Sequence, residues 1–225
     1  MRASILCKKL FNWAGVFCCF AFVVVCIIYS FAVKKADVVR IQNNYSFVVK
    51  RYENAEVGSF ESEQLGGAGS TMRIDGQTCV AVSVYENLTD AERICQELGN
   101  EYVVYTMRPN DLYLLTNSQK LCAGKYKGAF SSLDGCIQVL AGEIARLDKG
   151  ATQESSKRIL NGLKRQFSYL AKSYQTDFPE YADVCQSAEE QLQEDIADVV
   201  YARKLRALLC KLCESYCNLT RRFLP

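Results

Sequence analysis

The chain contains no histidine among its 225 residues. That absence excludes Ser-His-Asp and Cys-His catalysis, histidine-ligated metals and the usual proton carrier near neutral pH. The charge is nearly balanced, at +2 from 27 basic and 25 acidic residues, so no strong field points to nucleic acid as a partner. We therefore predict that the protein is not an enzyme, has no cofactor and does not bind nucleic acid.

Proline is scarce as well, with three in the whole chain, and no proline-rich or low-complexity linker divides it. Apolar residues make up 49% of the chain, which is ample for a folded core. The length allows one large or two small folded units.

One long uncharged segment lies near the amino terminus, after a short basic tail at 1–9. Residues 10–33 form a run of 24 residues without a charge. As a helix this run would reach about 36 Å, enough to cross a bilayer core of about 30 Å. A cleaved signal peptide is the alternative, but its apolar region is usually about 7–15 residues. We predict a transmembrane helix, whose orientation the balanced flanking charges do not decide.

The rest of the chain divides into two parts by its hydrophobic pattern. Residues 34–116 carry short alternating runs typical of strands, and residues 117–225 carry apolar residues every three or four positions, typical of helices. We expect an α+β domain over 34–116 and a helical domain over 117–225.

Local signals predict the elements of the α+β part. Asn44 to Tyr52 is a candidate strand, and Asp75-Gly76 suits a tight hairpin before a strand over Gln77 to Tyr85. Thr89 with Glu92 predicts a capped helix that Gly99 ends, and Glu101 to Met107 is the next strand. Units of strand, helix and strand place helices on one face of a sheet.

These residues carry a resemblance to a known family. A strand at Val80–Tyr85, a polar step at Glu86–Asp90 and a helix from Ala91-Glu92 to Leu98 resemble the second half of the SPOR (sporulation-related repeat) domain. The first half would occupy 46–65, where the strand is clear and the helix weak. The stretch from Gly66 to Ile94 is similar to a glycine-rich form found in membrane-anchored SPOR-like proteins of spore-forming Firmicutes.

The resemblance implies a small ferredoxin-like antiparallel sheet of four strands with helices on one face. The other face would bind peptidoglycan glycan strands stripped of their stem peptides, outside the cell membrane, in division or sporulation. A sugar polymer favours aromatic rings and hydroxyl groups on a shallow surface. Strand alternation places Thr78, Val80, Val82 and Val84 on one face, and Cys79, Ala81, Ser83 and Tyr85 on the other. The glycan-binding candidates are Ser83, Tyr85, Tyr102 and Tyr105; the alternative is that the helical part covers this face.

Three apolar stripes predict three helices in the carboxy-terminal part, with Gly150 and Phe178-Pro179 between them. The stripes are Leu133, Ile137, Leu140, Ile144 and Leu147; Leu160, Leu163, Phe167, Leu170 and Tyr174; and Leu205, Leu209, Leu212, Tyr216 and Leu219. We expect an antiparallel three-helix bundle. Its stripes serve packing, or one of them receives a protein partner.

Twelve cysteines are present, three of them close together at Cys210, Cys213 and Cys217. Thiolates at such spacing can ligate zinc or an iron–sulfur cluster, but a fourth ligand is not identifiable. Each follows an apolar stripe residue, so we interpret the three as core residues and predict no metal. Cys7, Cys18, Cys19 and Cys26 lie in or near the predicted span, and Cys79, Cys95, Cys122, Cys136 and Cys185 lack the dense spacing of a disulfide scaffold.

The sequence therefore predicts a single-pass membrane protein whose folded part lies outside the cell membrane and binds without catalysis. Glycan binding by the SPOR-like domain is the first hypothesis. The alternative is a membrane-tethered scaffold that recruits a protein partner through its carboxy-terminal helices.

Overall fold

The computed structural model describes residues 37–41, 43–192 and 198–223. Within these ranges, no helix combines the length and the apolar character that a membrane crossing requires. The basic tail, the predicted span 10–33 and the four cysteines in or near it lie outside the described residues. The described residues from Val39 onward form one compact unit.

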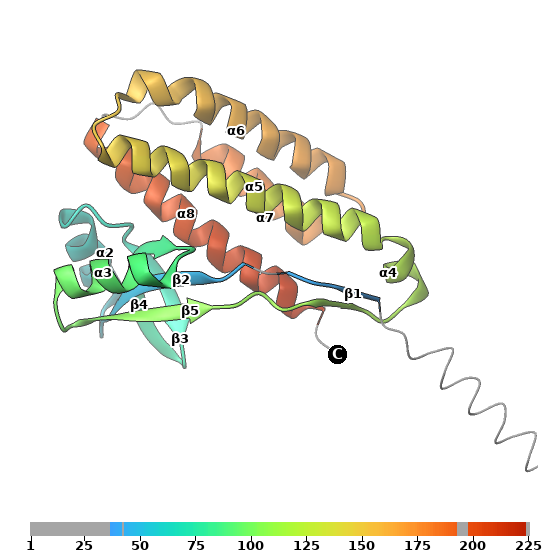
Figure 1. Ribbon diagram of the computed structural model, residues 1–225, viewed down its shortest axis with the longest axis horizontal. Helices are drawn as coiled ribbons and strands as arrows, with labels where there is room; N and C mark the ends of the chain where they lie inside the picture. The colour runs from blue at the N-terminus through green and yellow to red at the C-terminus, as the bar shows by residue number, and fades with distance from the viewer. Residues whose placement is uncertain (1–36, 42, 193–197, 224–225) are drawn as a thin grey trace, which may run out of the picture. The chain divides into compact units, whose positions relative to one another are not determined.

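The first part of this unit alternates strands and helices (Figure 1). In chain order it consists of β2 (Tyr45–Arg51), α2 (Ala55–Gln64), β3 (Ser70–Ile74), β4 (Gln77–Tyr85), α3 (Leu88–Leu98) and β5 (Tyr102–Met107). The strands form one antiparallel sheet in the order β3-β4-β2-β5. The predicted four-stranded antiparallel sheet is confirmed. The predicted hairpin is also confirmed, since Asp75 and Gly76 have φ values of 50° and 78° between β3 and β4.

Asparagine side chains begin both helices of this part. Asn54 accepts hydrogen bonds from two backbone N–H groups at the start of α2, and Asn87 accepts one from Thr89 at the start of α3. The prediction that Thr89 is the cap of α3 is therefore wrong, and the helix begins two residues earlier than expected. Gly99 ends α3 with a φ of 106°, as predicted.

Helices α2 and α3 cover one face of the sheet. Val48, Val80 and Val82 are buried there, and glycines allow α2 and the bend after it to come close. A Cβ on Gly58 would lie 2.5 Å from the Tyr52 ring, and one on Gly67 would lie 2.6 Å from Val82. The glycines are thus required by close packing.

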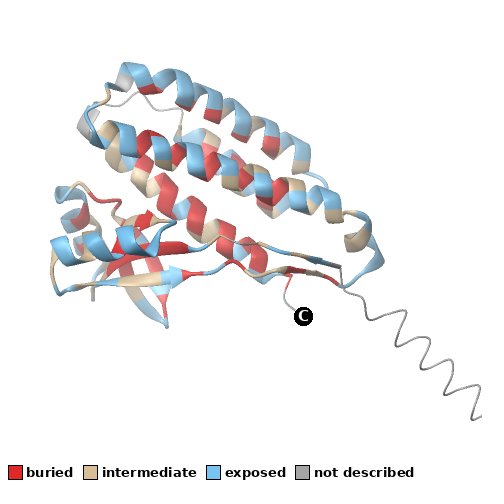
Figure 2. Ribbon diagram, viewed as in Figure 1, coloured by how far each residue is buried: buried red, intermediate tan, exposed pale blue. Residues whose placement is uncertain are grey.

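Helix α8 (Asp198–Arg221) lies against the opposite face of the sheet (Figure 1). Figure 2 shows buried residues along both β2 and α8. Tyr45, Phe47 and Val49 of β2 belong to the same hydrophobic cluster as the interior of the helices. Of the two alternatives for this face, the structure has the one in which the helical part covers it.

A bulge in β4 changes the alternation expected from the sequence. Val48 pairs with Ser83 but Val49 pairs with Ala81, so Val82 is an extra residue on the β4 side. Beyond it, Val84 pairs with Phe47 and joins the cluster that faces α8. The prediction that Val84 shares a face with Val80 is therefore wrong, because strict alternation holds only without a bulge. The prediction that Ser83 and Tyr85 share a face with Ala81 is wrong for the same reason, since they pair with Val48 and Ser46 of β2.

The last strand ends at Leu114, and the first helix of the carboxy-terminal part begins at Asn117. β1 (Asp37–Val39) and β6 (Leu112–Leu114) form a separate two-stranded sheet. The helices that follow are α4 (Asn117–Leu121), α5 (Ala123–Asp148), α6 (Gln153–Tyr174), α7 (Pro179–Gln191) and α8. The mixed α+β class is confirmed.

The described residues of the carboxy-terminal part form four long helices, α5 to α8, rather than the predicted three. Phe178-Pro179 was expected only to separate two helices. Pro179 also begins α7, because the missing N–H of a proline costs no hydrogen bond in the first turn of a helix. The predicted stripes face the interior: Leu133, Leu140, Leu163, Phe167, Leu205 and Leu212 are among their buried members.

Candidate functional site

A pocket of about 350 Å³ lies where the sheet, α5 and α8 meet. The end of β4 and the first turn of α3 form one wall, and α5 and α8 form the others. All of these elements belong to the same compact unit. The volume falls within the usual range of ligand pockets, about 300–1,000 Å³.

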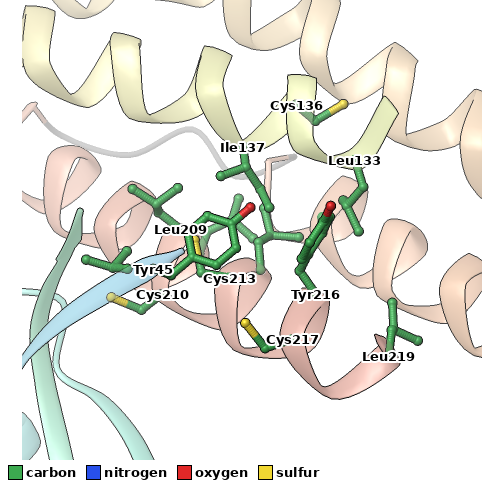
Figure 3. Close-up of a cluster of buried hydrophobic side chains, with 14 of the residues drawn as sticks. Tyr45, Leu133, Cys136, Ile137, Leu209, Cys210, Cys213, Tyr216, Cys217 and Leu219 are labelled. Atoms are coloured by element: carbon green, nitrogen blue, oxygen red, sulfur yellow. The ribbon is translucent and has the colours of Figure 1, made fainter. Parts of the chain in front are cut away.

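The floor of the pocket is apolar. Tyr45, Ile137, Leu209 and Cys213 line it, and Figure 3 shows Tyr45 reaching from β2 toward Ile137 and Leu209. The Tyr45 hydroxyl donates a hydrogen bond to Asp134 at 3.2 Å, which fixes the ring. Burial is the main reason that the pKa of Tyr45 is raised, so the phenol stays neutral at physiological pH.

One side of the rim holds a balanced ion pair. Arg206 of α8 donates to the carboxylate of Asp148 at the end of α5 and, at 2.7 Å, to the carbonyl oxygen of Gly66. The side chain of Arg206 is 21% exposed. Two acceptors thus hold this guanidinium, and Asp148 neutralises its charge.

The other side of the rim carries two carboxylates, Glu86 and Asp90, on either side of the helix cap Asn87. Within the described part of the chain, neither forms an ion pair. The pKa of Glu86 is raised, first by partial desolvation and second by the nearby carboxylate of Asp134. Counting Asp148 and Arg206, the lining has three carboxylates and one guanidinium. The pocket therefore carries two negative charges in excess.

Ser83 lines the pocket, but it pairs with Val48 of β2, so its side chain lies on the face that α2 and α3 cover. Its Oγ is buried and has no hydrogen-bond partner among the described residues. A buried hydroxyl without a partner costs free energy, about 1–3 kcal/mol.

The structure brings together two of the four residues predicted to bind glycan. Ser83 and Tyr85 both line the pocket. Tyr102 lies elsewhere on β5, with its ring 5.8 Å from the Lys50 Nζ, and Tyr105 is half-buried opposite Phe47.

Sequence reasoning did not identify the charged residues of the rim. Glu86 and Asp90 flank Asn87 in the stretch between β4 and α3, so a correct assignment of the helix cap would have pointed to them. No sequence signal joins Asp148 to Arg206, which are 58 residues apart.

The three clustered cysteines are buried in α8, as the sequence indicated. Figure 3 shows Cys210, Cys213 and Cys217 spaced along the helix among apolar side chains. Burial raises the pKa of all three thiols, which disfavours the thiolate that binds metals. In the ranges that the structure describes, no group of three or more histidine, cysteine, aspartate or glutamate residues is placed to hold a metal ion. The eight cysteines of these ranges are free thiols.

A second, shallower groove of about 310 Å³ separates α7 from α8. Its apolar lining includes Val184, Ala188, Leu208 and Leu212, and its polar lining includes Asp183, Lys211 and Glu214. This groove is formed entirely by the carboxy-terminal helices.

The chain matches no protein-family model, no curated protein and no solved structure. The resemblance to SPOR domains thus stays a prediction from the sequence.

Proposed function

We propose that this is a non-catalytic binding protein, tethered to a membrane by residues 10–33, whose ligand occupies the pocket between β4, α5 and α8. The observation that carries the proposal is the pocket itself, which combines an apolar floor with a charged rim. Pockets with a mostly apolar lining and a few polar groups are typical binding sites.

A binding role is favoured over catalysis by the state of the nucleophiles. Cys213 lines the pocket, but burial raises its pKa well above that of a free thiol. Without a histidine in the chain, the usual general base for activating a thiol or hydroxyl is missing. The pocket therefore offers recognition groups and no activated nucleophile.

The order of the strands supports the SPOR resemblance, but the coverage of the sheet by α8 argues for a binding site other than the sheet face. The chain order β2-α2-β3-β4-α3-β5 and the sheet order β3-β4-β2-β5 agree with the ferredoxin-like arrangement expected of a SPOR domain. In such a domain the face opposite α2 and α3 would hold glycan, but here α8 covers that face. Muramic acid also carries a carboxylate, which the acidic rim of the pocket would repel.

The proposal is tested by filling the pocket. The full chain, in detergent, would be screened against a library of neutral, cationic and anionic fragments by ligand-observed NMR. Ala145→Trp places an indole at an exposed position of the pocket wall. We expect it to abolish the signals of bound fragments.

Val139→Trp is the matched control, since Val139 is also exposed on α5 but does not line the pocket. Fragments that bind both variants equally, or no fragment binding at all, would contradict the proposal.

The groove between α7 and α8 favours a second candidate function, the recruitment of a protein partner through the carboxy-terminal helices. Its apolar floor and mixed charges suit one face of an amphipathic helix. A photocrosslinker at Ser187, compared with one at the exposed Arg165 of α6, tests this in membranes. A partner trapped only from position 187 supports recruitment, and equal trapping from both positions contradicts it.

A further inference from the structure

The pocket lining has more carboxylates than cations. The ion pairs and hydrogen bonds of each charged residue show which carboxylates have no cationic partner in the part that the structure describes. Asp148 neutralises Arg206, and the second acceptor of Arg206 is the Gly66 carbonyl. Asp134, which lies behind Tyr45, accepts hydrogen bonds from Asn43, Tyr45 and Gln138. Glu86 and Asp90 remain at the rim without a cation among the described residues. Their charge is available to a ligand.

The floor sets the second requirement. Ile137, Ile144 and Leu209 line the pocket, so a ligand that fills it has to bring apolar surface against them. An inorganic cation would leave this surface exposed to water, which is unfavourable. The ligand has to combine a cation with a hydrocarbon body.

The third requirement comes from the rim carboxylates, which accept hydrogen bonds. A protonated amine has up to three N–H donors for them. A sulfonium or quaternary ammonium group has none.

We propose that the pocket binds an organic ammonium ion, with its hydrocarbon body on the floor formed by α5 and α8 and its charge beside Glu86 and Asp90. This inference rests on the proposed function, because it names the ligand class of the same pocket. The ammonium belongs to a free amine or to a lysine side chain of a peptide. Both present the same chemistry to the pocket.

Isothermal titration of the full chain with three probes of equal length tests the charge preference. We expect hexylammonium to bind at least about tenfold more tightly than 1-hexanol, and hexanoate to bind weakest, because two rim carboxylates attract the first and repel the last. The combined variant Glu86→Gln, Asp90→Asn should weaken hexylammonium about tenfold and leave hexanol unchanged. Raising the salt concentration should weaken only the ammonium probe.

The matched control removes two charges from exposed positions outside the pocket, by Glu53→Gln and Glu92→Gln. It should leave hexylammonium binding unchanged. A pentapeptide with one lysine between leucines is the second arm: tighter binding than hexylammonium assigns the source to a peptide, and weaker binding assigns it to a free amine.

Two results would overturn the inference while leaving the proposed function intact. One is equal or tighter binding of hexanol or hexanoate that Ala145→Trp abolishes, because the pocket would then bind ligands of another class. The other is hexylammonium binding that survives Glu86→Gln with Asp90→Asn. Absence of binding by all three probes would also refute the inference, and the fragment screen then decides separately whether the pocket binds anything.

Discussion

The ring of Tyr45 in β2 meets the ring of Tyr216 in α8 edge to face, with 5.7 Å between the centroids. This contact crosses from the sheet to the helices, and both side chains are buried. It makes the covered face of the sheet part of the common core. The ligand of the proposed function therefore binds at the edge of this junction, in the pocket that Tyr45 lines.

Removal of the Tyr216 ring should destabilise the sheet and the helices together. Tyr216→Ala leaves a cavity in the shared core, and we expect a loss of about 3–5 kcal/mol in the free energy of unfolding. Hydrogen exchange measured by mass spectrometry would report peptides from β4 and from α6 separately.

Both sets of peptides should lose protection to the same extent. Tyr169→Ala is the control, since Tyr169 is 65% exposed on α6, and it should change stability by less than about 0.5 kcal/mol. Protection of β4 that is unchanged in Tyr216→Ala would show that the sheet is independent of α8.

Alanine should have opposite effects at two helical glycines. In Gly58→Ala the new methyl group would lie 2.5 Å from the Tyr52 ring and 2.8 Å from Val80, so we expect a loss of about 1–3 kcal/mol. In Gly142→Ala the methyl group meets no atom within 4 Å apart from the neighbouring backbone of α5, and the helix should gain up to about 1 kcal/mol. Urea unfolding curves of the two variants compare them directly, and a stabilising Gly58→Ala would disprove the close packing of α2 on β4.

The sequence predicted those parts of the fold that local patterns determine. The Asp75-Gly76 hairpin, the end of α3 at Gly99 and the stripes of α5, α6 and α8 all follow from residues near one another in the chain. The bulge at Val82 had no local signal, because it depends on how β4 pairs with β2. One extra residue there moved Val84 to the other face.

The candidate site was harder to predict for a related reason. Ser83 and Tyr85 were chosen as polar residues of an open sheet, and they do line the pocket, but at its junction with the helices. Whether the sheet is open depends on long-range packing of α8, more than 100 residues away in the chain. Arg206 could not be foreseen as a rim residue, since its partners Asp148 and Gly66 belong to other elements.

Stability should depend on pH through Glu214 of α8. Partial burial raises the pKa of this carboxyl above its ordinary value of about 4.3, although Arg221 lowers it in part. The folded state therefore holds the proton more tightly than the unfolded state, and the stability that the neutral carboxyl contributes is lost as pH rises through the folded pKa.

Glu214→Gln should accordingly raise the melting temperature at neutral pH and have little effect below about pH 4, where both states are protonated. Differential scanning calorimetry at the two pH values measures this. Glu92→Gln on the exposed surface of α3 should leave the melting temperature unchanged at both. A Glu214→Gln variant that melts lower at neutral pH would contradict the burial of an ionised carboxylate.

The thiols of α8 should resist alkylation in the folded protein. Cys210, Cys213 and Cys217 are buried and their pKa values are raised, so the reactive thiolate is scarce near neutral pH. Peptide mapping after brief iodoacetamide treatment should find them unmodified, and fully modified after unfolding in guanidinium chloride. Rapid modification of Cys213 in the native protein would mean that it is an accessible nucleophile and would weaken the argument against catalysis.

The most direct test of the account is a crystal structure of the full chain with hexylammonium. We predict the ammonium nitrogen within about 4 Å of the Glu86 or Asp90 carboxylate, the usual limit for an ion pair, and the alkyl chain against Ile137 and Leu209. The sheet should remain covered by α8. A ligand bound to the sheet face, with α8 displaced from β4, would contradict the central claim that this protein binds its ligand where the sheet and helices join.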